Sequence, residues 1–109
     1  GKMLINSKTV MNYIKATKLQ YEENRDKFLE MTAGLEYPVV VSFKFIRGSR
    51  HKFDYINPAQ TVQDLMVKNE WIEDDNANYI IPRFEEFIYD KENPGVEIQV
   101  YGRECNTIG

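Results

Sequence analysis

Four aspartates follow one another through the middle of this sequence: Asp54, Asp64 and the adjacent pair Asp74 and Asp75. Carboxylates suit hard cations, and Mg2+ is often held by one or two carboxylates together with waters and phosphate oxygens. Such a site requires that acids from separate elements converge on one side of the fold. The same four residues can also be explained as a helix cap and a solvated loop, so both interpretations stay open.

A basic segment directly precedes the first of these aspartates. Residues 47–52, Arg-Gly-Ser-Arg-His-Lys, form a predicted turn on a protein whose net charge is −3. One interpretation is a phosphate-contacting loop delivered next to the acids, and the other is a solvated hairpin tip. The candidate nucleic-acid contacts are Lys44, Arg47, Arg50, His51 and Lys52.

Two helices are predicted. Residues 8–33 lack proline and glycine and carry apolar residues near helical spacing, which predicts one long helix or two shorter ones before Gly34. Asn57 as N-cap and Pro58 in the first turn predict a second helix that ends near Asn69. Its polar face is predicted to carry Gln60, Asp64 and Lys68, and its apolar face Val62, Leu65 and Met66.

Strands are predicted on either side of the second helix. Alternating β-branched and aromatic residues predict a strand over residues 38–46. Phe53 and Tyr55 flank Asp54 with a period of two, which predicts that Asp54 lies on a second strand paired with the first.

The end of the chain predicts a closing hairpin. Residues 84–89 suggest a strand, although their spacing fits a helical turn nearly as well. Residues 96–101 favour a strand, and the turn-forming residues 90–95 lie between the two segments. The predicted fold class is therefore α+β, with a single domain over residues 1–109 and a loose tail at 102–109.

The composition excludes several classes of protein. Hydrophobic residues make up 42% of the chain, which is too many for a disordered protein, and no apolar run is long enough to span a bilayer. The single cysteine, Cys105, cannot form an internal disulfide, which favours a reducing, cytoplasmic compartment. The spacing of cysteine and histidine is unsuited to structural zinc, and no phosphate-binding glycine motif or serine nucleophile motif occurs.

The ordered acids and basic residues resemble the signature of the RusA family of Holliday-junction resolvases. That signature has a basic segment, then Asp-x-Asp-Asn, a lysine three residues after the Asn, an aspartate on the same helix and a terminal Asp-Asp pair. The matching positions here are residues 47–52, Asp54, Asn57, Asp64, Asp74 and Asp75, and the order of predicted elements is similar over nearly the whole chain.

The resemblance implies a RusA-like fold and a small homodimeric endonuclease of recombination and repair. It implies Mg2+ or Mn2+ as cofactor and branched DNA as partner. Catalysis and metal binding would fall to Asp54, Asp74 and Asp75, with Asn57, Gln60 and Asp64 in supporting roles.

Two positions depart from the signature. Its second acid falls on Ile56 and its lysine on Gln60. An isoleucine cannot bind a cation, and the neutral amide of Gln60 cannot offset charge on a phosphate in the transition state. Removal of one such electrostatic group often costs on the order of 10²–10³ in rate. Asp64 or Glu73 are the acids that could supply the missing charge.

Three hypotheses about function follow. The first is a Mg2+-dependent RusA-like nuclease that cuts branched DNA. The second is a RusA-like fold that binds DNA or protein without cleavage, which Ile56 and Gln60 favour. The third is a small globular domain with no nucleic-acid role, in which Asn57 is an N-cap, Asp64 pairs with Lys68, and Asp74 and Asp75 form a turn.

Overall fold

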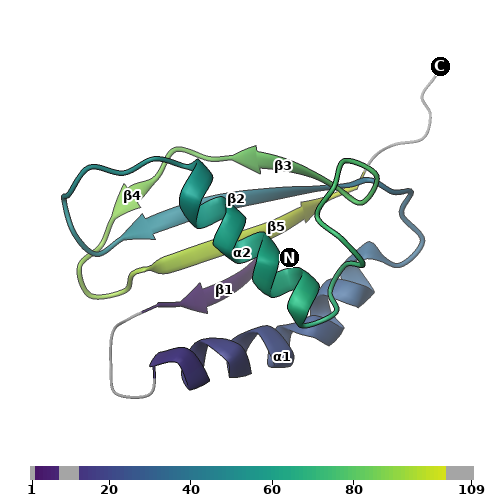
Figure 1. Ribbon diagram of the computed structural model, residues 1–109, viewed down its shortest axis with the longest axis horizontal. Coiled ribbons are helices and arrows are strands. Elements are labelled where there is room, and N and C mark those ends of the chain that lie inside the picture. Colours follow the sequence, from purple (N-terminus) through teal and green to yellow (C-terminus); the bar gives the residue numbers. More distant parts are fainter. Residues whose placement is uncertain (1, 8–12, 103–109) are drawn as a thin grey trace.

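A computed structural model describes residues 2–7 and 13–102, apart from the side chains of residues 13–16. This part of the chain has two helices and one mixed sheet, which confirms the α+β class (Figure 1). The elements in chain order are β1 Lys2–Asn6, α1 Tyr13–Thr32, β2 Val39–Arg47, α2 Ile56–Lys68, β3 Ile80–Phe84, β4 Ile88–Tyr89 and β5 Gly95–Tyr101.

The central strand of the sheet is β2. It pairs antiparallel with β5 on one side and parallel with β3 and β4 on the other, and β1 pairs antiparallel with β5. β3 lies beside Val39–Phe43 and β4 beside Ile46 and Arg47, so these two short strands form one edge in succession. The strong β preference of the β2 sequence suits a strand with neighbours on both sides.

Both helices contribute to the core on one face of the sheet (Figure 1). Side chains alternate along β2, and those that point to this face are fully or almost fully buried. The core residues from β2 are Val39, Val41, Phe43 and Phe45, those from α1 are Tyr21 and Phe28, and those from α2 are Ala59, Val62 and Met66.

Trp71 connects the two helices. It follows α2 and is only 1% exposed. Its indole Nε1 donates a hydrogen bond of 2.8 Å to the carbonyl oxygen of Tyr21 in α1. Its ring stacks on Phe28 at 5.0 Å and lies 5.3 Å from the ring of Tyr21, measured between centroids. This contact fixes where the chain leaves α2, and so where the loop with Asp74 and Asp75 begins.

Gly95 allows β1 to approach β5 closely. A Cβ atom at this position would collide with the carbonyl oxygen of Ile5 on the neighbouring strand. The adjacent Pro94 carbonyl accepts a hydrogen bond of 2.9 Å from the backbone N–H of Ser7. A glycine is therefore required here for its lack of a side chain, and not for an unusual φ.

Several predictions about the helices are confirmed. The first helix is continuous over its described residues and ends at Thr32, and Gly34 has a φ of 80°, typical of a residue after a helix. α2 ends at Lys68 with Asn69 as its C-cap. Residues 8–12 and the predicted tail at 103–109 lie outside the described residues. Neither described helix is long and apolar enough to cross a bilayer.

The prediction that Asp54 lies on a strand paired with 38–46 is wrong. Residues 52–54 form no strand, and both edges of β2 are occupied by other strands. The alternation of Phe53 and Tyr55 has another cause, because both rings pack against Phe45, at 5.8 and 6.3 Å between centroids. Aromatic packing onto the core produced a strand-like pattern without a hydrogen-bonded partner.

The predicted closing hairpin is also wrong. Two strands do form at 88–89 and 95–101, but they lie on opposite sides of β2 and do not pair with each other. A strand was not predicted at β1, and Pro82 does not end β3, since an edge strand tolerates a proline. The actual partners are far apart in sequence, which periodicity cannot reveal.

Trp71 offers a direct test of the packing between the helices. Trp71→Phe should lower the free energy of unfolding by about 1–3 kcal/mol because it removes the indole hydrogen bond to Tyr21 and replaces a buried ring with a smaller one. Trp71→Ala should cost about 3–5 kcal/mol. Urea denaturation measures both. The control is Leu19→Ala on the exposed surface of α1, expected within about 0.5 kcal/mol of the parent protein. A Trp71→Phe variant as stable as the parent would contradict this role.

Candidate metal centre and nucleic-acid interface

The exposed face of α2 carries Asp64 and the two positions, Ile56 and Gln60, that depart from the signature. Ile56, Gln60 and Asp64 are spaced four residues apart, so they lie on one side of the helix, and all three are exposed. Ala59, Val62 and Met66 are buried on the other side. The apolar face that anchors α2 on the sheet thereby determines which residues face outwards.

Gln60 joins two of the predicted acids. Its side-chain nitrogen Nε2 donates to Asp64 Oδ1 at 2.9 Å and to Asp75 Oδ2 at 3.0 Å. An amide nitrogen carries two hydrogens, so one group can satisfy both carboxylates. The acid on the helix and the second acid of the loop pair are therefore bridged by one amide group.

Asp54 caps the start of α2. Its Oδ1 accepts a hydrogen bond of 3.0 Å from the backbone N–H of Asn57, and its Oδ2 accepts one of 3.2 Å from the Asn57 side chain. Tyr55 already has helical torsion angles, φ −79° and ψ −24°. The prediction that Asn57 is the N-cap is therefore wrong, because Asp54 does this work and Asn57 lies inside the first turn.

Asp74 turns its carboxylate into its own loop. Oδ1 accepts from the backbone N–H of Asp75 at 2.7 Å, and Oδ2 accepts from the side chain of Asn76 at 3.0 Å. Asn76 in turn accepts from the backbone N–H of Asn78 at 2.8 Å. These bonds shape the loop and leave Asp75, rather than Asp74, to reach α2.

A hydrogen bond between Glu73 and Tyr79 joins the two ends of the same loop. The Tyr79 hydroxyl donates to Glu73 Oε2 at 2.6 Å. This bond and the negative charge of Glu73 raise the pKa of Tyr79 above its ordinary value of 10.0, with smaller contributions from burial and from Asp74. Glu73 therefore holds a neutral phenol and does not join Asp64 and Asp75.

The three predicted metal ligands, Asp54, Asp74 and Asp75, each accept a different hydrogen bond. Within the described residues, no three side chains of the histidine, cysteine, aspartate or glutamate type group closely enough to hold a metal ion. Asp64 and Asp75 form a pair, and Asp54 stands at the N-terminal end of the same helix. Ile56 lies one turn, about 6 Å, before Gln60 along the axis and is 67% exposed. Ile56, which stands where the signature has its second acid, thus lies along α2 between Asp54 and the turn that contacts Asp75.

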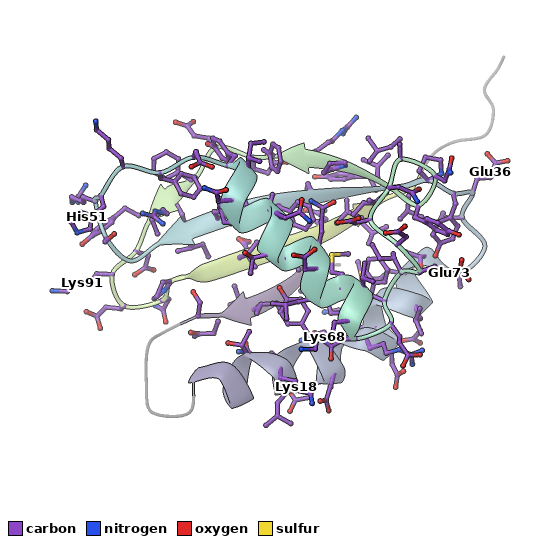
Figure 2. All side chains as sticks on the ribbon, viewed as in Figure 1. Lys18, Glu36, His51, Lys68, Glu73 and Lys91 are labelled. Atoms are coloured by element: carbon purple, nitrogen blue, oxygen red, sulfur yellow. The ribbon has the colours of Figure 1, made fainter. Side chains whose placement is uncertain are left out.

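Three of the five predicted basic contacts are exposed beside the start of α2. Arg50, His51 and Lys52 lie in the loop that leads to Asp54, and His51 lies at one end of the molecule (Figure 2). The guanidinium of Arg50 stacks over the ring of Tyr89 at 3.9 Å, which orders that side chain. Lys91 projects at the same end (Figure 2), and sequence reasoning did not single it out.

The other two basic residues lie elsewhere. Lys44 points to the face of the sheet opposite the helices, where it is paired in register with Glu97 and lines a pocket of about 230 Å³. Arg47 points to the helix face, half-buried, with its guanidinium 4.6 Å from the centroid of Phe53. The alternation along β2 explains this separation, since the two positions differ by an odd number of residues.

No protein-family model matches this sequence, and no curated protein matches it. The function is therefore argued from the residues and their geometry.

Asp54 can be tested as a helix cap without reference to a metal. Asp54→Ala should lower the free energy of unfolding by about 1 kcal/mol, whereas Asp54→Asn should cost only a few tenths because its amide oxygen can still accept from Asn57. Thermal and urea denaturation measure the difference. Lys52→Ala, in the adjacent loop, is the control. Equal stability of the alanine and asparagine variants would show that the cap contributes nothing.

The bond between Tyr79 and Glu73 predicts a pH effect. The folded protein holds the phenol neutral, so the stabilisation is present below pH 10.0 and is lost as the pH rises through the raised pKa. Glu73→Gln removes the negative charge and should bring the pKa of Tyr79 back towards 10.0. An NMR titration of the tyrosine ring measures both values. An unchanged pKa in the variant would exclude Glu73 as the cause.

Proposed function

We propose that this chain is a RusA-like protein that binds branched DNA in the cytoplasm, as a homodimer, and cleaves it with Mg2+ or Mn2+. The main support for the proposal is that the side chain of Gln60 donates hydrogen bonds to both Asp64 and Asp75. These residues lie on the exposed side of α2, and Asp54 caps the start of that helix. Three separated signature positions are adjacent there. The RusA-like fold is part of the same proposal, supported by a mixed sheet with α2 between two parallel strands.

The charge distribution supports binding of a phosphate backbone. Arg50, His51 and Lys52 are exposed directly before α2, whose N-terminus carries a partial positive charge. A DNA strand that follows this loop would pass Asp54 and then the acids at Gln60. The net charge of −3 makes such binding local rather than general.

The donor set suits a hard cation with few protein ligands. Asp75 is the central ligand, Asp64 supplies charge that Ile56 lacks, and Asp54 stands at the near end of the helix. Waters and phosphate oxygens complete such a site in other proteins. A cation bound there would activate the attacking water and neutralise charge that develops on the phosphate. Gln60 holds the two carboxylates together, and Asp74 holds the loop in shape.

An exposed apolar edge supports self-association. β3 and β4 pair only with β2, and their outer edge and the segment between them carry exposed apolar side chains. A soluble protein seldom exposes such an edge without a partner. The exposed residues are Ile81, Phe84, Phe87, Ile88 and Tyr89.

A second candidate is a RusA-like protein that binds branched DNA without cleaving it. Ile56 and Gln60 favour it, because they replace an acid and a cation of the signature with an apolar and a neutral side chain. The two candidates share the binding surface and differ only in the chemistry of the acids.

Cleavage of a synthetic four-way junction separates the two candidates. The parent protein should cut with Mg2+ or Mn2+, and Asp75→Asn should lower the rate on the order of 10²–10³-fold. Ile56→Asp, which adds a carboxylate between Asp54 and Asp75, should raise it. Asp26→Asn on the exposed surface of α1 is the matched control. Cutting that survives Asp75→Asn excludes the metal role, and binding without any cutting selects the second candidate.

The salt dependence of junction binding tests the basic loop. A gel-shift titration should show affinity that falls steeply with salt. Arg50→Ala and Lys52→Ala should each reduce the slope of log K against log salt by about 1, because each removes one phosphate contact. Lys44→Ala, on the opposite face of the sheet, is the control. Binding that is absent, or insensitive to salt, would refute both candidates.

A further inference from the structure

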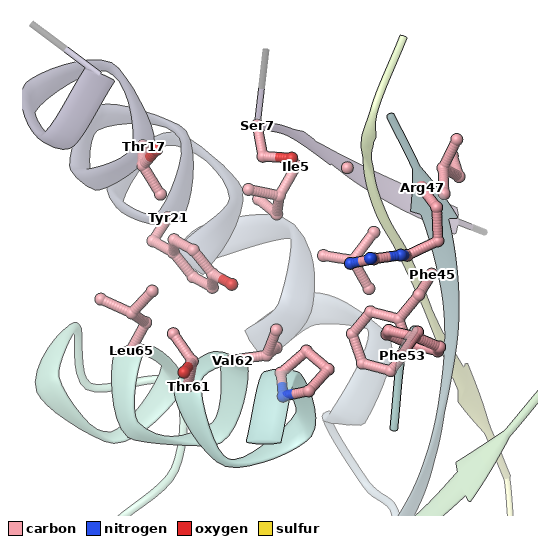
Figure 3. A pocket seen from close by; sticks show the side chains of 14 residues that line it. Ile5, Ser7, Thr17, Tyr21, Phe45, Arg47, Phe53, Thr61, Val62 and Leu65 are labelled. Carbon is pink, nitrogen blue, oxygen red and sulfur yellow. The ribbon is translucent and has the colours of Figure 1, made fainter. Parts of the chain in front are cut away.

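A cavity of about 250 Å³ lies between the two helices and the helix face of the sheet (Figure 3). Its walls are mostly apolar and come from every layer of the fold. They include Ile5 of β1, Phe45 of β2, Phe53 of the following loop, and Val62 and Leu65 of α2. The cavity is separate from the acids, because Gln60 and Asp64 lie on the exposed face of α2.

Two polar atoms in this cavity have no hydrogen-bond partner. Among the described residues, Thr17 Oγ1 and Arg47 Nε are the buried side-chain nitrogen and oxygen atoms that lack one, and both residues line the cavity. Unpaired buried polar atoms are uncommon, and a bound water or ligand is a frequent partner for them. Both residues line the same cavity, so one ligand bound there is a candidate partner for both atoms.

The charge of Arg47 is also uncompensated. Figure 3 shows its guanidinium extending from β2 across the cavity. Within the described part of the chain, no carboxylate lies within ion-pair distance of it. The guanidinium donates a hydrogen bond of 3.4 Å from Nη2 to the His51 carbonyl and stacks over the ring of Phe53. The Nε atom of Arg47 is buried without a partner, so an anion that accepts a hydrogen bond from it would be favoured in the cavity.

We propose that this cavity binds a small carboxylate with an apolar body. The carboxylate accepts from Arg47 Nε and from the hydroxyl of Thr17, and the apolar body fills the space between Ile5, Phe45 and Val62. At about 30 Å³ per water-sized group, the volume suits a molecule of roughly eight to ten non-hydrogen atoms. The inference does not depend on the proposed DNA binding.

The chemistry of the walls selects this ligand class. A planar guanidinium matches the geometry of a carboxylate, and one cation balances one negative charge. The apolar walls would leave the outer oxygens of a free phosphate unsatisfied, whereas they exclude water from an aliphatic or aromatic body. A neutral amide of the same shape would lack the charge that Arg47 requires.

NMR titration of the parent protein with hexanoate and benzoate tests the proposal. Benzamide serves as the neutral probe and inorganic phosphate as the anion without an apolar body. Hexanoate or benzoate should shift resonances of residues around Arg47 at millimolar concentration or below. Benzamide and phosphate should bind at least tenfold more weakly, the loss expected for a hydrogen bond to a charged group.

Three variants assign the binding to this cavity. Arg47→Met should weaken benzoate binding roughly tenfold or more, and Lys52→Met in the loop after β2 should leave it within about twofold. Thr61→Phe, which places a ring at the cavity wall without a change in charge, should block binding even if Arg47→Met fails to fold. No binding of either carboxylate, equal binding of phosphate, or affinities unaffected by Arg47→Met and Thr61→Phe would each overturn the proposal.

Discussion

The hydrogen bond from the Trp71 indole to the Tyr21 carbonyl is the contact on which the arrangement depends most. It joins residues 50 positions apart, both of them almost fully buried, and holds the C-terminal end of α2 against α1. Because Trp71 is fixed, the loop after it must turn back along α2 rather than extend into solvent. The loop thereby places Asp75 beside the second turn of α2, where its carboxylate accepts a hydrogen bond from Gln60. A core contact thus determines the position of a surface carboxylate.

On the exposed face of α2, repulsion between two carboxylates is opposed by their hydrogen bonds to Gln60. Asp64 and Asp75 repel, and the neutral amide of Gln60 holds them together without cancelling their charge. The two carboxylates are therefore held near each other by one neutral side chain. Asp54 has a structural role that is independent of any cation, since it caps the helix. A cap and a ligand are compatible in one carboxylate, because each oxygen has more than one lone pair.

Sequence alone predicted where helices and strands occur better than it predicted which strands pair. The helices, the β2 strand and the outward face of α2 follow from local periodicity, and the structure agrees. The pairing of strands depends on contacts distant in sequence, and both predicted hairpins were wrong. Aromatic spacing imitated a strand at Phe53 and Tyr55 because the rings pack on Phe45. In the candidate site, the sequence singled out both Asp64 and Asp75, which the structure brings to the same side chain, Gln60. The capping role of Asp54 could not be predicted, because it depends on where the helix begins in three dimensions.

The central claim is that Asp75 is held beside α2 as a ligand for a divalent cation. Paramagnetic line broadening by Mn2+ measures this most directly, since the effect decays steeply with distance from the bound ion. We expect substoichiometric Mn2+ to broaden the amide resonances of Gln60, Asp64 and Asp75 first and to spare those of Asp90 and Lys91, with competition by Mg2+. Broadening that is absent, uniform over the surface, or centred away from α2 would contradict the account.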